Sequence, residues 1–246
     1  MTSDLFIKRY DDPQRCSVAA AHHDWLTGLE SGVRIPHLIT RTSHHLAFER
    51  LPGRTPRVAD LPRVASALGR LHDAAYWKEL HSARLDQPHA TSIGLVLPDF
   101  AGPRRDALHR ATRLTGVDLA ALDTVLDRTG SLTSFYKDPN LRNYLVDEEK
   151  NVAVVDFDDL TLAPFGYDLA GLLVTASMTY GRLEQRILTN CADAYRAAIA
   201  PSLCDLEELR QYAELHHLLT LRYLGTNGYR HPWPTVRPWP NPFAST

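Results

Sequence analysis

Apolar and polar residues follow two different patterns along this chain of 246 residues. Near the start, short apolar runs at 5–10, 33–39 and 46–53 are typical of β-strands, and a helical stretch at 14–29 follows the first run. From residue 53 onward, apolar residues mostly recur at intervals of three and four, which predicts helices. The change of pattern predicts an α+β fold with a small domain of strands and one helix, followed by a larger, mostly helical domain.

The C-terminal part is expected to contain five helices and an irregular tail. The predicted helices cover 61–75, 119–128, 167–179, 183–200 and 206–223. The third of these is apolar on all sides, so it should be buried. Five prolines among residues 229–243 argue against regular structure in the tail. The segment Gly53-Arg54-Thr55-Pro56 is the natural boundary, which gives domains at 1–52 and 53–246.

Two short apolar runs in the C-terminal part, Tyr144–Val146 and Val152–Val155, flank a polar turn and predict a β-hairpin. A pairing that is symmetric about the Glu149–Lys150 bond would place the first residue of one run opposite the last residue of the other. The residues just outside the hairpin, Asn143 and Asp156, would then emerge side by side at its open end.

The residues at this open end have the side chains that a magnesium site requires. Mg²⁺ prefers oxygen ligands and is usually held by one or two protein groups, while phosphates and water complete its octahedron. Asn143 and Asp156 supply an amide oxygen and a carboxylate. Asp138 precedes them in a loop that Pro139 and Asn140 keep from becoming helical, so it should reach the same place from the side. The three polar residues therefore predict a site for a magnesium-bound nucleotide, with the first of them where a substrate hydroxyl would arrive.

The order of these residues resembles the catalytic core of the aminoglycoside phosphotransferase and choline kinase-like families. These small-molecule kinases share the two-lobed protein-kinase fold, and their pattern is HxDxxxxN, a β-hairpin, a metal-binding Asp and a helix that opens with an Asp in a YDLA-like context. The matching residues here are Tyr136-Lys137-Asp138 with Asn143, then Asp156, then Tyr167-Asp168-Leu169-Ala170. The resemblance implies a kinase that uses ATP and Mg²⁺ and transfers the γ-phosphoryl group to a hydroxyl of a small molecule.

The resemblance also implies a role for each polar residue of the motif. Asp138 would orient the substrate hydroxyl and accept its proton. Asn143 and Asp156 would hold Mg²⁺. Asp168, at the start of the apolar helix, would accept a hydrogen bond from the backbone of the catalytic loop.

Three further residues are expected to support the site. Tyr136 stands where the families usually have His, and a Tyr can support the loop in the same way, by packing and hydrogen bonding. Lys137 follows it within the motif. Asp158 is a candidate second metal ligand or a contact for a substrate amine, although for both Asp158 and Asp159 a solvated acidic turn is the simpler interpretation.

The N-terminal part also resembles the N-lobe of a kinase, except for the glycine-rich hairpin. Kinases place a phosphate-binding Lys on a strand and an acidic partner on the following helix. Lys8 lies on the first predicted strand, in a chain that otherwise prefers Arg, and Asp24 is the acid that the helix offers, although the families typically have Glu nearby. Nothing before Leu5 forms the glycine-rich hairpin that covers the phosphates, so either they are held without it or the sequence starts late.

The predicted strand at 46–53 resembles the last strand of a kinase N-lobe, which leads into the hinge between the lobes. The resemblance implies that adenine forms hydrogen bonds with the backbone of Glu49, Arg50 and Leu51. Because these contacts are made by the backbone, the identities of the side chains say little about them.

Charge, hydropathy and cysteine content indicate which other partners and which compartment to expect. The net charge of −2 and the lack of a basic stripe argue against nucleic acid. No apolar run approaches the length of a membrane span. Cys16, Cys191 and Cys204 are odd in number and far apart, which favours reduced thiols and a cytoplasmic protein. Neither the oligomeric state nor the acceptor molecule follows from these patterns.

Two other functions compete with the kinase interpretation. The segment from Asp156 to Thr161 nearly matches the DxDxT loop of haloacid-dehalogenase-like phosphatases, but the Thr comes one residue late and too little chain follows for their parallel sheet. A non-catalytic pseudokinase is favoured by the missing glycine-rich hairpin, by the lack of a clear acidic partner for Lys8 and by Tyr136. The complete set of Asp138, Asn143 and Asp156 opposes it, because a binding module does not need these residues.

Overall fold

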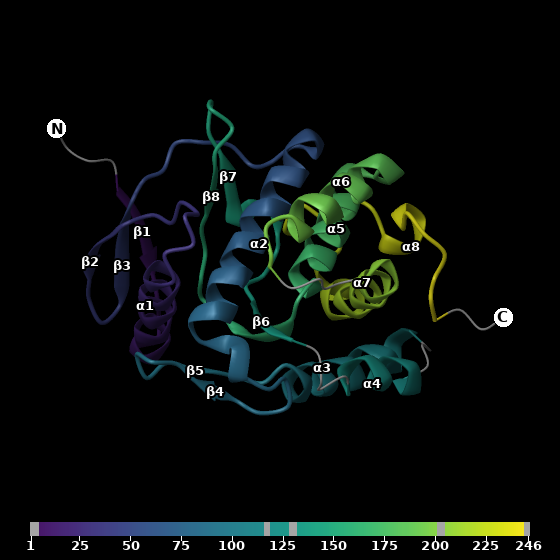
Figure 1. Ribbon diagram of the computed structural model, residues 1–246, viewed down its shortest axis with the longest axis horizontal. Helices are drawn as coiled ribbons and strands as arrows, with labels where there is room; N and C mark the ends of the chain where they lie inside the picture. The colour runs from purple at the N-terminus through teal and green to yellow at the C-terminus, as the bar shows by residue number, and fades with distance from the viewer. Residues whose placement is uncertain (1–4, 116–118, 128–131, 201–204, 244–246) are drawn as a thin grey trace.

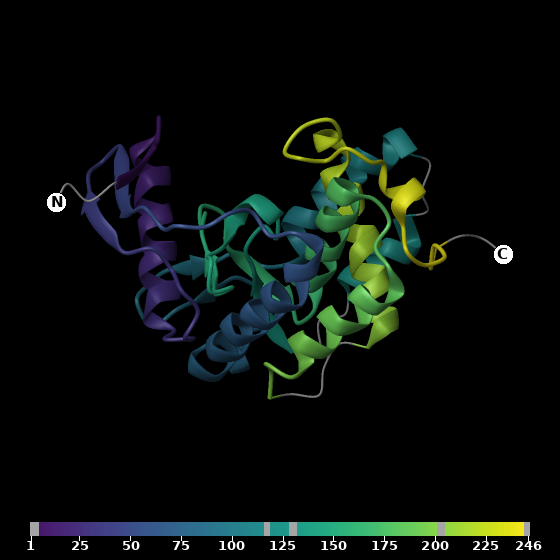
Figure 2. The same ribbon diagram turned by 90° about the horizontal axis from the view of Figure 1, so that it is seen from above.

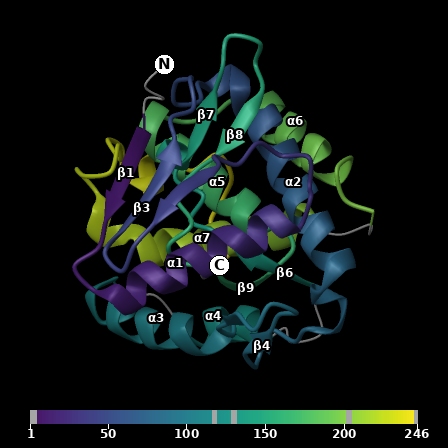
Figure 3. The same cartoon turned by 90° about the vertical axis from the view of Figure 1, so that its left-hand side faces the viewer.

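The computed structural model describes residues 5–115, 119–127, 132–200 and 205–243, and these form a small N-terminal lobe beside a larger lobe (Figure 1). The small lobe consists of β1 (Leu5–Arg9), α1 (Pro13–Gly28), β2 (Leu38–Arg41) and β3 (His45–Glu49). Its strands form an antiparallel sheet in the order β1-β3-β2. Figure 3 looks onto this lobe, with β1, β3 and α1 in front of the larger lobe. The predicted small lobe of strands and one helix is confirmed, but the strand predicted at 33–39 is wrong in place, because β2 covers Leu38–Arg41.

The helix and the sheet of the small lobe enclose a core of their own. Buried residues from both elements form it, and these are Tyr10, Cys16, Ala19, Ala20, Leu46 and Phe48. α1 begins sharply because Asp12 caps it, accepting a hydrogen bond from Gln14 N at 2.9 Å, and because Pro13 suits the first helical position. The small lobe therefore has a packed core of its own. Figure 2 shows this lobe beside the larger lobe.

Helices make up most of the larger lobe. They are α2 (Leu61–Lys78), α3 (Ala101–Thr115), α4 (Leu119–Leu126), α5 (Tyr167–Tyr180), α6 (Gln185–Arg196), α7 (Leu206–Thr220) and α8 (Trp233–Val236). α2 packs on α6, and α5 packs on α7. Nearly every residue of α5 is buried, as its uniformly apolar sequence predicted. All five predicted helices are present, with ends that differ by a few residues.

Two helices were not predicted from the sequence. α3 consists largely of Arg, Thr, Ala and other residues without a regular apolar stripe. α8 is a single turn within the proline-rich tail, where irregular structure was expected, and its first residue, Trp233, is fully buried. Burial of one large aromatic side chain holds this part of the tail on the lobe.

Short strands of the larger lobe hold the loops that contain the motif residues. β6 (Thr133–Tyr136) pairs with β9 (Thr161–Pro164), and β7 (Tyr144–Val146) pairs with β8 (Val152–Val154), both antiparallel. A third small pair joins β4 (His89–Ala90) to β5 (Val96–Leu97). The motif residues lie in the loop between β6 and β7 and directly after β8.

The predicted hairpin is present as β7 and β8, but its predicted register is wrong by one residue. Tyr144 pairs with Val154, not with Val155. Val155 N instead donates to Asn143 O at 2.9 Å. Asp156 therefore lies one residue beyond the paired end instead of directly opposite Asn143.

The turn of this hairpin explains the shifted register. Asp147 N donates to Asn151 O at 3.2 Å, which closes a loop of three residues between them. The last of the three, Lys150, has a φ of 68°. A three-residue loop that ends in a left-handed residue is a common hairpin connection, and it moves the centre of symmetry onto Glu149.

α5 passes directly below the loop between β6 and β7, and Gly171 allows this close approach. A Cβ atom at Gly171 would overlap Pro139 Cγ and would lie 3.1 Å from His216 Cε1. Gly171 is thus the point at which the buried helix supports the loop that carries Asp138.

We predict that Gly171→Ala lowers the free energy of unfolding by about 1–3 kcal/mol, because an added methyl group must push the proline away. Gly28→Ala is the matched control, since nothing lies within 4 Å of a Cβ at that position near the end of α1. Urea unfolding of the two variants measures the difference. Equal stability of both variants would contradict the close approach.

Two expectations from composition can be compared with the fold. Within the described ranges, no helix has both the length and the apolar character needed to cross a membrane. Cys16 and Cys191 are buried free thiols, and Cys204 lies outside the described residues.

Candidate active site

A cavity of about 850 Å³ lies between the two lobes. Apolar residues from both lobes form part of its wall, and these include Ala19, Leu46, Phe48, Leu145 and Phe157. Predicted site residues form another part, namely Lys8, Glu49, Arg50, Leu51, Asp138, Asn143, Asp156 and Asp158. The residues predicted to contact nucleotide, metal and substrate hydroxyl thus line one cavity, although they come from distant parts of the sequence.

Asp138 lies in the loop after β6 with a φ of 50°. This left-handed conformation is uncommon for residues other than Gly, Asn and Asp. Asn140 N donates to Asp138 Oδ1 at 3.3 Å, and Asn143 Nδ2 donates to Asp138 Oδ2 at 3.2 Å. Burial raises the pKa of Asp138, while the charge of Lys137 and these two donors oppose the rise. A carboxylate with a raised pKa that lines a cavity has the properties of a general base.

The loop that carries Asp138 is held from below by α5. Asp168, in the first turn of this helix, is fully buried and accepts a hydrogen bond from Lys137 N at 3.0 Å through Oδ2. His72 Nε2 lies 3.6 Å from the same oxygen, and His72 Nδ1 lies 2.7 Å from the Tyr195 hydroxyl. Asp168 therefore contacts the backbone of the loop and does not reach the cavity.

Tyr136, the last residue of β6, supports the loop by packing. Its ring meets the ring of Tyr167 edge-on at 5.7 Å, and the guanidinium of Arg104 lies 5.0 Å from its centroid. Burial raises the pKa of Tyr136 well above its ordinary range. Its hydroxyl forms no hydrogen bond with any residue that the structure describes, so the hydrogen-bonding part of the predicted support is not seen.

Lys137 is a buried cation close to Asp138 and Asp156. Its side chain is 1 % exposed, and Nζ donates to Val155 O at 3.0 Å. The amine also lies 4.9 Å from the ring centroid of Tyr144 and 5.6 Å from that of Phe157. Burial lowers the pKa of Lys137 to about 8, so the amine is still mostly protonated at neutral pH. Its charge stabilises the ionised form of Asp138.

We predict that Lys137→Met moves the acidic limb of the pH profile of kcat/KM to higher pH. Removal of the positive charge raises the pKa of Asp138 further, and a general base must be ionised to act. Lys78→Met is the control, because Lys78 is an exposed lysine that pairs with Glu30 away from the cavity. An unchanged acidic limb in Lys137→Met would show that Lys137 does not act on Asp138.

Asn143 and Asp156 lie near each other at the end of the hairpin, although not in the predicted pairing. Asp156 has a φ of 66°, and its side chain is 46 % exposed. Asn143 directs its amide nitrogen to Asp138, which leaves Oδ1 as the atom suited to a metal. Across the described ranges, no group of three or more His, Cys, Asp or Glu is placed to hold a metal ion. A carboxylate and an amide oxygen do fit Mg²⁺ that arrives with phosphates and water as its other ligands.

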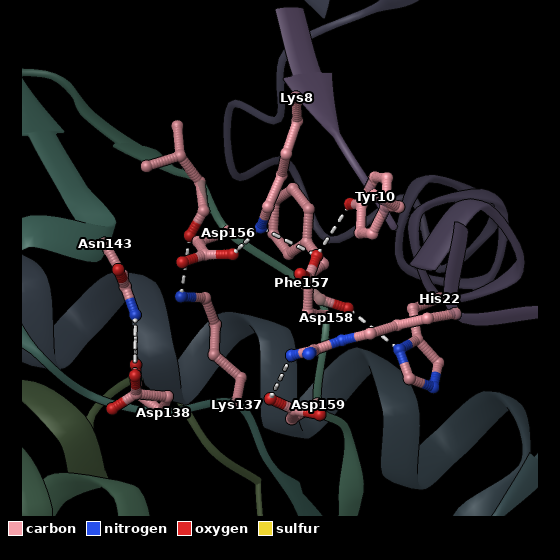
Figure 4. A network of polar contacts seen from close by, with 12 residues as sticks. Lys8, Tyr10, His22, Lys137, Asp138, Asn143, Asp156, Phe157, Asp158 and Asp159 are labelled. Carbon is pink, nitrogen blue, oxygen red and sulfur yellow. Dashed lines mark hydrogen bonds and ion pairs between the residues drawn. The ribbon is translucent and has the colours of Figure 1, made fainter. Parts of the chain in front are cut away.

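Lys8 reaches across from β1 to the acidic residues after β8. Its Nζ contacts Asp156, and it lies 2.7 Å from Asp158 Oδ1 (Figure 4). Burial lowers the pKa of Lys8, but hydrogen bonds and charge attraction from the two carboxylates outweigh this and raise it overall. Asp24, the candidate that the helix offered, is not the partner of Lys8, because it lies 3.5 Å from Arg41 and is about half exposed.

Asp158 is not the solvated residue that the acidic sequence suggested. Its side chain is 15 % exposed, and it accepts a hydrogen bond from the Tyr10 hydroxyl at 2.9 Å. Asp159 does match that interpretation, because its side chain is 78 % exposed and lies 3.9 Å from Arg15. Tyr10 was missed as a site residue, although its place two residues after Lys8 puts both side chains on the same face of the strand.

The predicted hinge residues Glu49, Arg50 and Leu51 line the cavity, but one of their N–H groups is already engaged. Glu49 N already donates to His37 O at 2.9 Å, so this N–H is not available to adenine. The Glu49 carboxylate accepts hydrogen bonds from Arg34 and from His37 N, each at 2.8 Å. Backbone contacts from Arg50 and Leu51 to adenine stay a prediction.

Comparisons with known proteins identify the family. Residues 3–215 match the phosphotransferase enzyme family, so the chain belongs to that family. It is thus a member of a family of small-molecule phosphotransferases, as the motif predicted. No curated protein matches the sequence. The phosphatase alternative is wrong, because the strand before Asp156 belongs to a two-stranded antiparallel hairpin and not to a parallel sheet.

Solved structures share the fold at low sequence identity. Aminoglycoside phosphotransferase APH(3'')-Id from Streptomyces rimosus, in complex with ADP and streptomycin, is 18% identical with a TM-score of 0.58, covering 88% of this chain and 86% of that one. Macrolide 2'-phosphotransferase MphH from Brachybacterium faecium is 18% identical with a TM-score of 0.61, covering 90% and 78%. Amicoumacin kinase hAmiN, in complex with AMP-PNP, Ca²⁺ and its ligand, is 14% identical with a TM-score of 0.62, covering 87% and 72%. These matches confirm the protein-kinase-like fold.

Proposed function

We propose that this protein transfers the γ-phosphoryl group of ATP to a hydroxyl of a small molecule, with Mg²⁺ bound at the site. The observation that carries the proposal is the meeting of Asp138, Asn143, Asp156 and Lys8 along one cavity between the lobes. Phosphoryl transfer depends mainly on positioning and on stabilising negative charge. The ADP and AMP-PNP in the structures of two similar proteins support a nucleotide as the phosphoryl donor.

The nucleotide would lie with its base toward the hinge and its phosphates toward Lys8. Leu46, Phe48 and Leu145 give the cavity an apolar wall, which suits the faces of an adenine ring. Lys8 carries the positive charge that the phosphates require, and its raised pKa keeps it protonated at neutral pH. Asn143 and Asp156 would hold Mg²⁺, which when bound neutralises charge on the phosphates.

Asp138 would act on the acceptor. It would accept a hydrogen bond from the acceptor hydroxyl, orient its oxygen toward the γ-phosphorus and take its proton as the new oxygen–phosphorus bond forms. The bond between the γ-phosphorus and the bridging oxygen breaks in the same transfer, which leaves ADP. Lys137 supports this step because its buried charge favours the ionised carboxylate.

The acceptor class is proposed only as a small-molecule alcohol. The similar solved proteins include a macrolide phosphotransferase, an amicoumacin kinase and a microcompartment-associated aminopropanol kinase, so their names cover very different acceptors. A screen with radiolabelled ATP against aminoglycosides, amino alcohols, sugars and nucleosides tests the proposal. Labelled product from one acceptor class supports it.

A pseudokinase is the second candidate, and two observations favour it. Lys8 contacts Asp156, the residue proposed to hold the metal, and Tyr136 replaces the usual His of the motif. Thermal unfolding with and without Mg-ATP, combined with the acceptor screen, separates the two functions. Stabilisation by Mg-ATP without transfer to any acceptor favours the pseudokinase, whereas stabilisation with transfer favours the kinase. Absence of both results would contradict a nucleotide site.

A further inference from the structure

The contacts of Lys8 raise the question of what holds this lysine when a metal occupies the site. Lys8 Nζ lies between Asp156 and Asp158 (Figure 4). The two carboxylates differ in environment, since the side chain of Asp156 is 46 % exposed and that of Asp158 is 15 % exposed. Asp156 is therefore the more accessible to an incoming ion, and Asp158 is the more fixed.

α1 does not supply the acidic partner that kinases usually place on this helix. Asp24 is the one acid within Pro13–Gly28, and it lies against Arg41 at the far side. What α1 directs toward the site is His22, whose Nδ1 lies 2.8 Å from Phe157 O. A carbonyl oxygen only accepts, so Nδ1 carries the hydrogen. Burial lowers the pKa of His22, so it is a neutral donor that holds the backbone between the two acids.

Tyr10, directly after the strand that carries Lys8, fixes Asp158. The Tyr10 hydroxyl donates to Asp158 Oδ1 at 2.9 Å, and Lys8 Nζ lies 2.7 Å from the same oxygen. Burial, and next the charge of Asp158, raise the pKa of Tyr10, so its hydroxyl keeps its proton and stays a donor. One carboxylate oxygen is thus bound by Lys8 of β1 and by Tyr10, the residue directly after β1.

We propose that Asp158, held by Tyr10, is the positioning residue that takes the place of the helix acid and holds Lys8 against the nucleotide phosphates. The inference rests on the proposed function. When Mg²⁺ binds Asp156, two positive charges cannot share that carboxylate favourably, so Lys8 gives up Asp156 and keeps Asp158. The acidic partner of Lys8 then comes from the metal-binding loop instead of α1, and Asp158 is not itself a metal ligand.

A double-mutant cycle between Lys8 and Asp158 tests this inference by nucleotide affinity. Isothermal titration with a non-hydrolysable ATP analogue and Mg²⁺ compares the wild type with Asp158→Asn, Lys8→Met and the double variant. We expect Asp158→Asn to weaken binding by roughly tenfold, which is the scale of a lost charge-assisted contact. The double variant should bind no more weakly than Lys8→Met alone, because Asp158 acts through Lys8.

Control variants separate positioning from other roles of Asp158. Asp159→Asn removes the same charge from the next residue, which does not face Lys8, and should bind like the wild type. Tyr10→Phe removes only the hydroxyl that holds Asp158, and should weaken binding in the same direction with a smaller effect; it also carries the test if Asp158→Asn does not fold. A metal-ligand role predicts instead that Asp158→Asn raises the Mg²⁺ concentration for half-maximal binding.

The outcomes distinguish this inference from the proposed function. If the wild type does not bind the analogue, the proposed function fails, and with it the basis of the inference. If the wild type binds and Asp158→Asn binds equally well, only the inference is overturned. It is also overturned if Asp158→Asn weakens binding by the same factor in the Lys8→Met background as in the wild type.

Discussion

Asp138→Asn should reduce turnover by roughly 10²–10⁴-fold, the usual contribution of a general base. The amide cannot accept the proton of the acceptor hydroxyl. Asn suits the backbone at this position, because Asn also tolerates the left-handed conformation that Asp138 adopts with a φ of 50°. Initial rates of ADP formation with an acceptor found in the screen measure the effect.

The fold should survive this substitution, which makes the loss of turnover interpretable. The buried carboxylate has a raised pKa, so the folded protein binds its proton more tightly than the unfolded chain does. Stability from this group therefore falls as pH rises above the ordinary pKa of Asp, and the neutral amide removes that cost. Loss of a hydrogen bond offsets the gain, so we expect a net change of less than about 1 kcal/mol. Wild-type turnover in Asp138→Asn would remove Asp138 from the reaction.

Asp156→Asn should reduce turnover by at least about a hundredfold, because the metal loses its charged ligand and charge on the phosphates is no longer neutralised. Asn is preferred to Ala here because Asp156 has a φ of 66°, a conformation that strains Ala. Without nucleotide, the variant should unfold near the wild-type temperature, since Lys8 still has Asp158 as a partner.

The nucleotide-bound state should separate the variant from the wild type. Mg-ATP should raise the unfolding temperature of the wild type and raise that of Asp156→Asn much less. Asp159→Asn is the matched control, as it loses one exposed charge from the same loop. Equal stabilisation of all three proteins by Mg-ATP would show that the metal does not bind at Asp156.

The sequence was informative where local pattern decides structure. The uniformly apolar stretch at 167–179 predicted the buried helix α5, and paired apolar runs predicted the hairpin β7–β8. The register of that hairpin was wrong because it depends on the left-handed conformation of Lys150 in the turn. A lysine carries no signal for that conformation, whereas a glycine there would have indicated it.

The candidate site was predictable as far as the motif extends. Asp138, Asn143 and Asp156 line one cavity, as their spacing suggested. The partner of Lys8 was not predictable, because Asp158 is 150 positions away in sequence numbering (158 − 8) and acidic residues after a strand usually face solvent. Tyr10 could have been noticed, since it shares a strand face with Lys8, but nothing in the sequence indicated what lies opposite that face.

The most direct test of the proposed phosphotransferase is transfer of label from radiolabelled ATP to the acceptor identified in the screen, measured for the wild type, Asp138→Asn and Asp159→Asn. The proposal predicts labelled acceptor with the wild type and with Asp159→Asn, and almost none with Asp138→Asn. Labelled acceptor formed by Asp138→Asn at the wild-type rate would contradict it.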